Sequence, residues 1–168
     1  KAIRRQRQMC IRDSSALGKT EEDFYCAIAS SFMLSADNAH AVHPHHPQKT
    51  DATNCVYMNE GIVVKSHAGQ KYTSDAVSIA VFKDLCKKAN VPVQFFANRS
   101  DEAGGSTLGN IAMAQVSMNS VDIGLPQLAM HSTYETAGIK DTYYMIQVMT
   151  EFFNCHISEI NTNVLKVD

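Results

Sequence analysis

The pattern that most constrains the fold is an amphipathic helix placed between two short apolar strands. Residues 62–65 (IVVK) are mostly β-branched and predict a strand. The Thr-Ser-Asp sequence at 73–75 supplies a helix cap, and apolar residues then recur at helical spacing over residues 76–85. Pro92 prevents the helix from continuing, and residues 93–97 (VQFFA) predict the next strand.

Further strands and helices are predicted on both sides of this unit, and together they give an α/β layer fold. They are strands at 32–36 and 121–124, and helices at about 20–28, from the 104–107 turn to about 116, and at about 141–155. The last helix places Tyr143, Ile146, Met149 and Phe153 on one face. Residues 1–12 are expected to form another helix, and residues 43–61 a long loop.

Composition narrows the class of protein. The chain has 168 residues, of which 45% are hydrophobic and 19% charged, as expected for one domain with a core. A net charge of -2 argues against a protein that coats nucleic acid or an anionic membrane, and the apolar runs are too short to cross a bilayer. The five cysteines are scattered without a CxxC pair, so we expect reduced thiols and a cytoplasmic location. The first residue is Lys1, so we expect a piece of something longer.

Potential metal ligands follow two of the predicted strands directly. Asp37 lies in SADNAHAVHPHHP at 35–47, and His131 in LPQLAMHSTYET at 125–136. Ligands of open α/β sheets lie at the carboxyl ends of strands, and a carboxylate and an imidazole suit zinc. Spacing alone leaves alternatives open: Asp37 as a cap on the following turn, and His131 as a hydrogen-bonded histidine at a strand-to-helix junction. The sequence contains no HExxH, and solvated loop histidines are the default for His45 and His46.

The order of several motifs resembles the aspartyl aminopeptidase family of metallopeptidases. These motifs are SADNAHAVHP, a lysine-containing strand, GQKYTS, a Gly-Ser-Thr loop and LPQLAMHSTYET. The resemblance extends from about residue 31 to 168. It implies part of a three-layer zinc-exopeptidase sheet with flanking helices, of which the N-terminal portion is missing. Residues 1–168 would then be the C-terminal part of the catalytic domain, without the family's dimerisation domain.

The resemblance implies a site with two zinc ions. The position of Asp37 is a terminal ligand of one zinc in the family, and that of His131 a terminal ligand of the other. The remaining ligands and the general-base glutamate lie upstream in the family. Here the pair Glu21 and Glu22 lacks the family's following Val-Gly-Ser and is interpreted as capping acids. We therefore expect no catalytic residue in this chain and no activity from the chain alone.

The family removes N-terminal Asp or Glu from peptides, which implies roles for four more residues. Lys65 stands where the family has a lysine that can pair with the acidic side chain; the alternative is a surface lysine. His40 is expected to donate to the developing oxyanion. Tyr72 is expected to bind substrate through its hydroxyl, or else to pack at the helix entry. His43 is expected to orient its neighbours, and the 104–107 turn to form a wall of the cleft with a helix cap at Ser106 or Thr107.

The resemblance also implies assembly, and it leaves two other functions open. The family forms a dodecamer built from dimers, and its partners are peptides with N-terminal Asp or Glu rather than nucleic acid or membrane. One alternative is a related two-zinc aminopeptidase with a different side-chain preference. The other is a non-catalytic fragment that acts as a scaffold or binds metal weakly through its histidines.

Overall fold

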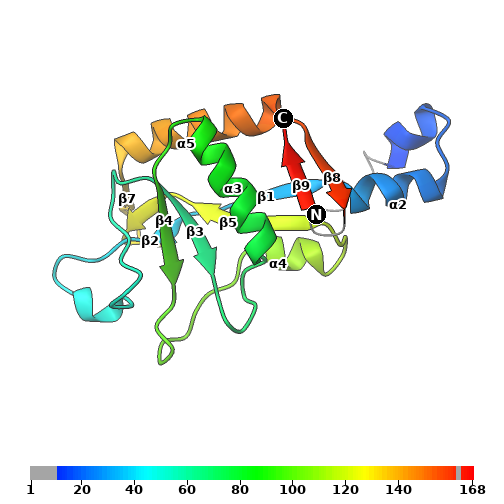
Figure 1. Ribbon diagram of the computed structural model, residues 1–168. Coiled ribbons are helices and arrows are strands. Elements are labelled where there is room, and N and C mark those ends of the chain that lie inside the picture. The colour runs from blue at the N-terminus through cyan, green and yellow to red at the C-terminus, as the bar shows by residue number, and fades with distance from the viewer. Residues whose placement is uncertain (1–10, 162–163) are drawn as a thin grey trace.

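The centre of the molecule is a four-stranded mixed sheet. The structure is a computed structural model and describes residues 11–161 and 164–168. The sheet contains β1 (Phe32–Ala36), β5 (Asn119–Gly124), β3 (Ile62–Ser66) and β4 (Val93–Ala97) in that spatial order (Figure 1). β1 runs parallel to β5 and β3 parallel to β4, whereas β3 and β5 are antiparallel. The predicted α/β class is confirmed, and the expected strands at 32–36 and 93–97 have the bounds that their apolar runs predict.

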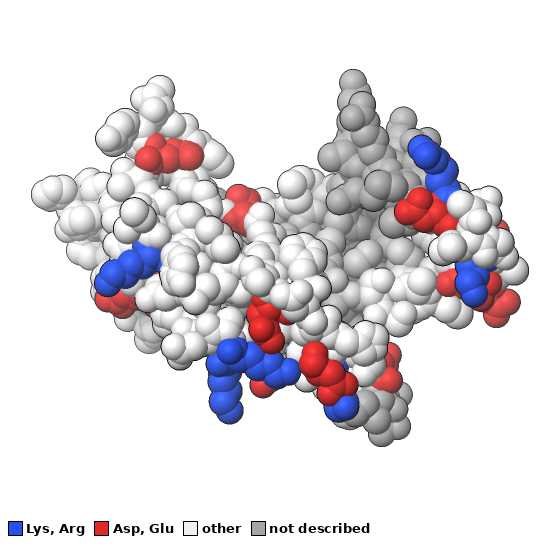
Figure 2. Space-filling view, turned by 90° about the horizontal axis from the view of Figure 1, so that it is seen from above, with Lys and Arg blue, Asp and Glu red and all other residues white. Residues whose placement is uncertain are grey.

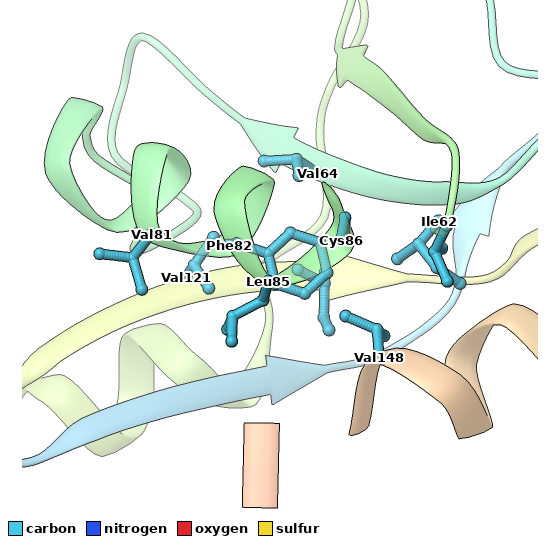
Figure 3. Packing of buried hydrophobic residues seen from close by; sticks show 10 residues of the cluster. Ile62, Val64, Val81, Phe82, Leu85, Cys86, Val121 and Val148 are labelled. Atoms are coloured by element: carbon cyan, nitrogen blue, oxygen red, sulfur yellow. The ribbon is translucent and has the colours of Figure 1, made fainter. Parts of the chain in front are cut away.

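Two long helices cover one face of this sheet and form the main core. They are α3 (Ala76–Lys88) and α5 (Ile139–Asn154). Figure 3 shows Phe82 and Leu85 of α3 and Val148 of α5 gathered in one cluster against the sheet. All three side chains are fully buried, and burial of a side chain of this size stabilises the fold by about 1.5–3 kcal/mol.

The opposite face of the sheet carries α4 (Leu108–Met113) and a second, smaller apolar cluster. Successive side chains of a strand point to opposite faces, so Asp122 points away from the core that holds Val121 and Ile123. On this side Gly109 of α4 lies so close to the sheet that an added Cβ would meet Ser35 Oγ at 2.6 Å. The second cluster includes Tyr72 and lies on this side of the molecule. Helices, sheet and helix therefore form three layers.

Two of the helices begin with reciprocal side-chain caps. Asp75 caps α3: its side chain accepts the Ser78 N–H at 2.7 Å, and Ser78 Oγ accepts the Asp75 N–H at 3.0 Å. Thr20 and Asp23 form the same reciprocal arrangement at the start of α2 (Glu21–Ala29). Such caps satisfy N–H groups that have no partner within a helix. The helix expected at 1–12 falls largely outside the described residues, although residues 11–16 are helical.

Several short elements were not predicted. They are β2 (Ala39–His40), β6 (Pro126–Leu128) and β7 (Thr136–Ala137), which form a small sheet, the 3-10 helix η1 (Pro47–Lys49), and the hairpin of β8 (Ile157–Asn161) and β9 (Val164–Val167). Strands of two or three residues are too short to show an alternating pattern. The predicted helix to about residue 116 is also shorter, because α4 ends at Met113.

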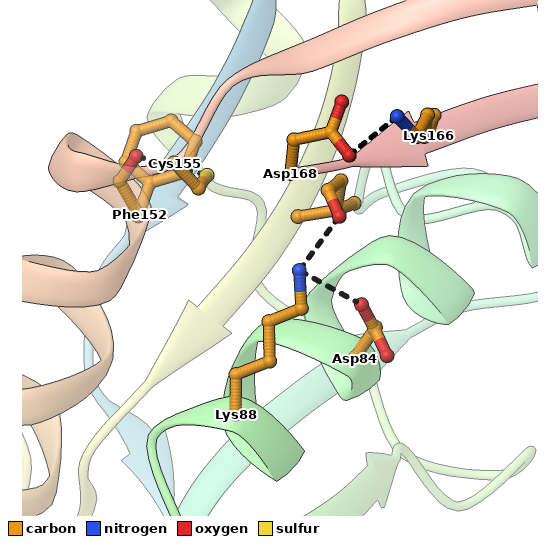
Figure 4. Close-up of polar contacts among 7 residues, drawn as sticks. Asp84, Lys88, Phe152, Cys155, Lys166 and Asp168 are labelled. Atoms are coloured by element: carbon orange, nitrogen blue, oxygen red, sulfur yellow. Dashed lines mark hydrogen bonds and ion pairs between the residues drawn. The ribbon is translucent and has the colours of Figure 1, made fainter.

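The hairpin is tied to α3 by a lysine near the end of that helix. Lys88 Nζ donates to the carbonyl oxygen of Val167 at 2.6 Å and lies 3.7 Å from Asp84 (Figure 4). A second ion pair joins Lys166 and Asp168 at 2.6 Å. Both pairs are at least partly exposed to solvent, so each contributes little to stability by itself.

Three of the four residues predicted for the apolar face of the last helix are turned to solvent, whereas the fourth, Met149, packs against the main core. Tyr143, Ile146 and Phe153 are 61%, 60% and 79% exposed, whereas Val148 is fully buried. Figure 2 views the molecule from above and shows a broad area free of Lys, Arg, Asp and Glu. The helix is apolar on two faces, which is why periodicity alone selects the wrong one. Within residues 11–161 and 164–168, the helices are too short or too polar to cross a membrane.

Candidate active site

A cavity of about 370 Å³ lies on the side of the sheet opposite the main core, and it gathers the predicted site residues. Its lining includes side chains from the ends of β1, β2 and β3 and from the loops that follow β3, β4 and β6. All six residues singled out by the sequence line this cavity: Asp37, His40, His43, Lys65, Tyr72 and His131. The long-range folding therefore brings together side chains that are up to 94 residues apart (131 − 37).

Asp37 is the first residue after β1, and its backbone is fixed by the neighbouring strand. Its N–H donates to the carbonyl oxygen of Ile123 on β5 at 3.0 Å. Gly124 permits this approach, because an added Cβ would lie 1.8 Å from the carbonyl oxygen of Asp37. The carboxylate accepts the N–H of Asn38 at 2.8 Å, a local contact of the kind that the alternative of a turn cap predicts. The side chain is exposed and lines the cavity.

His131 lies in a turn beyond β6 and not directly at a strand end as predicted. Two residues separate it from Leu128, the last residue of β6. Its φ of 66° is in the left-handed region, which is costly for a residue with a side chain. The His131 N–H donates to Glu135 Oε1 at 2.6 Å, and the Ser132 N–H to the Ala129 carbonyl oxygen at 3.0 Å. These bonds fix the turn that presents the imidazole to the cavity.

His40 ends β2 and is close enough to His131 and Lys65 to be affected by their charges. Its strand pairs with β6, with His40 opposite Gln127. Burial lowers the pKa of His40, and the positive charges of His131 and Lys65 lower that pKa further. The neutral imidazole is therefore favoured, and its N–H remains a hydrogen-bond donor.

Lys65 is a buried lysine and not the surface lysine of the alternative interpretation. Only 2% of it is exposed. Its ammonium group contacts the carbonyl oxygens of Asp37 at 3.5 Å and Asn38 at 3.3 Å, distances longer than usual for such bonds. Burial lowers the pKa of Lys65, while the negative charges of Asp37 and Asp122 raise it. Because an ammonium group has three donors, Lys65 retains capacity for an anionic partner.

Tyr72 is buried beside Lys65, with its hydroxyl bonded to the protein. The ring centroid lies 5.3 Å from Lys65 Nζ, a cation–π contact. The hydroxyl donates to Asn98 Oδ1 at 3.3 Å, and the ring contacts Phe96 edge-on. Burial raises the pKa of Tyr72, and the charges of Asp122 and Asp37 raise it further. Tyr72 therefore both packs at the loop before α3 and borders the cavity.

His43 contacts other histidines of its own loop at the rim of the cavity. Its ring lies 5.2 Å from that of His46, and its Nδ1 accepts the N–H of His45 at 3.2 Å. Arg99 joins this loop to the one after β4, since its guanidinium donates to the Gln48 carbonyl oxygen and, at 2.8 Å, to Asp101. Sequence reasoning missed Arg99, for which no motif gives a signal.

The glycine-rich turn forms a wall of the cavity, as predicted, through Gly105, Ser106 and Thr107. The predicted cap is wrong. Thr107 occupies the N-cap position of α4, but its side chain makes no capping bond, and Ser106 Oγ bonds the Lys71 carbonyl oxygen at 3.5 Å instead. Lys71 Nζ donates to the Gly104 carbonyl oxygen at 2.7 Å and so joins the wall to the loop before α3.

The cavity contains side chains that can act as individual metal ligands, but the described residues do not form a complete metal site. In the described part of the chain, no three His, Cys, Asp or Glu side chains converge closely enough to hold a metal ion. Asp37 and His131 offer one carboxylate and one imidazole to the same cavity, and both are common zinc ligands. The two side chains are therefore suited to act as single zinc ligands.

Comparison with known proteins identifies the family. The profile of the family described as aminopeptidase I zinc metalloprotease (M18) matches residues 6–153. A probable M18 family aminopeptidase 2 of Clostridium novyi is 52% identical over 139 residues, which are 83% of this chain and 32% of that protein. The chain thus spans about a third of the length of the curated relatives it matches.

Solved structures agree with the sequence relatives. The structure of the Ape4 and Nbr1 complex superposes with a TM-score of 0.80 at 38% identity, over 82% of this chain and 26% of that one. The S. cerevisiae mApe1 dodecamer gives a TM-score of 0.71 at 25% identity, over 85% of this chain and 32% of that one. The chain therefore belongs to the M18 family of zinc metalloproteases.

Proposed function

We propose that this chain forms one wall of the active site of a zinc-dependent aminopeptidase that removes N-terminal Asp or Glu from peptides. The observation that carries the proposal is the convergence of the six residues on one cavity, with the Lys65 ammonium buried among them. Membership of the M18 family supports the metallo-aminopeptidase activity. The chain spans only part of its relatives, so we propose the activity for the full-length protein that carries it.

The acidic preference rests on the cation in the cavity. A carboxylate that leaves water for a partly closed pocket needs a charged partner, because an unpaired buried charge is costly. Lys65 supplies this partner from a strand, and so from a rigid element of the fold. We propose that one donor of its ammonium group binds the substrate carboxylate, while the other two hold the carbonyl oxygens of Asp37 and Asn38.

We propose that the metal site takes further ligands from outside this chain, since no group of three ligands converges among its described residues. We propose that Asp37 and His131 each hold one of two zinc ions, and that the general base comes from the upstream part of the protein. Bound zinc would polarise the scissile carbonyl and lower the pKa of a bound water. From this chain, the neutral His40 would donate its N–H to the scissile carbonyl oxygen, and His43 would orient its loop neighbours.

Assembly and location are proposed on more general grounds. A solved relative, mApe1 of S. cerevisiae, is reported as a dodecamer, and we propose a homo-oligomer for the complete protein. We propose a cytoplasmic location, in keeping with the described cysteines, Cys26, Cys55, Cys86 and Cys155, which are free thiols. Cys10 lies outside the described residues.

The test is hydrolysis of small aminoacyl amides of Asp, Glu, Leu and Lys by the full-length protein, with zinc added and with a chelator control. We expect chelator-sensitive release of Asp and Glu, and little release of Leu or Lys. Equal hydrolysis of Leu would overturn the acidic preference but retain the aminopeptidase. Absence of all turnover would overturn the enzymatic proposal and favour a scaffold. The 168-residue chain alone is expected to release none of the four.

A further inference from the structure

A fully buried carboxylate lies beneath the candidate site, and no sequence motif gives a signal for it. Asp122 is in β5 and is 0% exposed. It points to the face of the sheet that carries the cavity, and its charge acts on both Lys65 and Tyr72. A buried carboxylate is costly unless hydrogen bonds satisfy it, so its partners indicate what it does.

The hydrogen bonds of Asp122 join β5 to the segment that directly follows Tyr72. Asp122 Oδ2 accepts the Thr73 N–H at 2.6 Å and the Thr73 hydroxyl at 3.0 Å. The Asp122 N–H donates to Ser74 Oγ at 2.9 Å. Thr73 Oγ1 also lies 3.0 Å from Ser120 Oγ. The side chain and the backbone of Asp122 thus fix residues 73 and 74 from two directions.

Tyr72 is therefore held at both ends. Its hydroxyl is bonded to Asn98 at 3.3 Å, and its backbone continues into the fixed Thr73. Between these anchors the ring lies 5.3 Å from Lys65 Nζ. The loop would otherwise be free to move, because loops on a surface are the more mobile parts of a fold.

We propose that Asp122 is a positioning residue: by binding Thr73 and Ser74 it holds the Tyr72 ring over the Lys65 ammonium group. Its effect on substrate rests on the proposed function, whereas its effect on Tyr72 does not. The placement of Lys65 and Tyr72 before substrate arrives is the kind of preorganisation that lowers the cost of binding.

The first test is NMR of the 168-residue chain with 13C-labelled lysine, which needs no activity. The Tyr72 ring is expected to shift the terminal methylene signal of Lys65 upfield, and Tyr72→Leu identifies that shift. Asp122→Ala should remove most of it. Asp122→Asn should retain the upfield shift, because the amide oxygen can accept both Thr73 donors in place of Oδ2. The NH₂ group then takes the place of Oδ1, which has no hydrogen-bond partner among the described residues.

Asp141→Ala is the matched control, since Asp141 is also 0% exposed and accepts two backbone N–H groups, from Asn59 and Gly61. It should destabilise the chain without moving the Lys65 signal. If Asp122→Ala does not fold, Thr73→Val replaces it and should move the signal partway. An unchanged Lys65 signal in Asp122→Ala contradicts the proposal, and so does an unchanged signal in Thr73→Val where that variant is used. Loss of the upfield shift in Asp122→Asn to the same extent as in Asp122→Ala also contradicts it.

The second test is kinetic and uses the full-length protein. Asp122→Ala should raise KM for Asp and Glu amides roughly 10-fold to 100-fold, with a smaller change in kcat, and Asp122→Asn should restore KM. Mere loss of stability removes active molecules and lowers the apparent kcat without raising KM. A wild type without acidic preference overturns the proposed function but leaves the NMR result valid. A wild type with that preference and an unaltered KM in Asp122→Ala overturns the positioning role.

Discussion

The ammonium nitrogen of Lys65 lies 5.3 Å from the centroid of the Tyr72 ring, in the interior of the cavity wall. The two residues come from different elements, β3 and the loop before α3. A lysine placed over an aromatic ring is stabilised in its charged form, while burial lowers its pKa. The pair therefore presents a desolvated cation whose direction is fixed.

Replacement of Lys65 by Met should remove the acidic preference of the full-length protein. A hydrogen bond to a charged group contributes about 1.5–3 kcal/mol, so kcat/KM for Asp amides should fall roughly 10-fold to 150-fold. Steady-state kinetics on Asp and Leu amides provide the measurement. Lys65→Arg is the control that retains the charge. An equal loss on both substrates would show that Lys65 acts on the whole site and not on the acidic side chain.

Gly124→Ala should destabilise the fold, because its methyl group would occupy the position of the Asp37 carbonyl oxygen. Overpacking of this kind costs about 1–3 kcal/mol or more, and we expect a lower urea midpoint at unchanged slope. Gly105→Ala is matched to it, since an added Cβ there meets nothing within 4 Å. Equal midpoints for the two variants would argue against the close approach of Gly124 and Asp37.

Truncation of a side chain should change the free energy of unfolding on the inner face of α5 much more than on its outer face. Val148→Ala removes fully buried methyl groups and should lower the free energy of unfolding by about 2 kcal/mol. Ile146→Ala acts on a side chain that is 60% exposed and should stay within about 0.5 kcal/mol of wild type. Denaturant unfolding of both variants distinguishes the faces. A larger loss for Ile146→Ala would mean that the outer face is covered in solution.

Cys86 should resist alkylation, whereas Cys26 should react. Burial raises the pKa of the Cys86 thiol to about 12, so it carries very little of the reactive thiolate at pH 8. Cys26 is exposed. The thiol of Cys86 loses its proton near pH 9 in the unfolded state but only near pH 12 in the native state. Its contribution to the free energy of unfolding is therefore complete below about pH 9 and is lost as the pH rises toward 12. Mass spectrometry after timed iodoacetamide treatment measures both rates; similar rates would contradict the burial of Cys86.

The local parts of the fold were predictable from the sequence. β1 and β4 are apolar runs with clear boundaries, and the α3 cap is encoded by Asp75 and Ser78 alone. The antiparallel pairing of β3 with β5 was not, because strand direction depends on contacts between residues some 60 positions apart in sequence (124 − 63 = 61). Which side of α5 faces solvent was also not predictable, since Tyr143 and Tyr144 give both faces of the helix similar apolar character.

The site residues that lie in sequence motifs were predictable, whereas those whose role depends on tertiary contacts were not. Asp37 and His131 lie in long motifs, and both line the cavity. Asp122 is a single carboxylate within a strand, a position that gives no sequence signal. Its significance comes from the hydrogen bonds to Thr73, about 50 residues upstream (122 − 73 = 49).

The left-handed backbone of His131 limits which substitutions can be interpreted. Alanine is the usual replacement for a suspected ligand, but at a φ of 66° it is disfavoured in the native turn. Asparagine adopts this conformation more readily than other residues with side chains. A loss measured for His131→Ala would therefore combine a missing imidazole with a displaced turn, whereas His131→Asn would report mainly the imidazole. The backbone conformation of this turn thus determines which substitution of His131 isolates the effect of the imidazole.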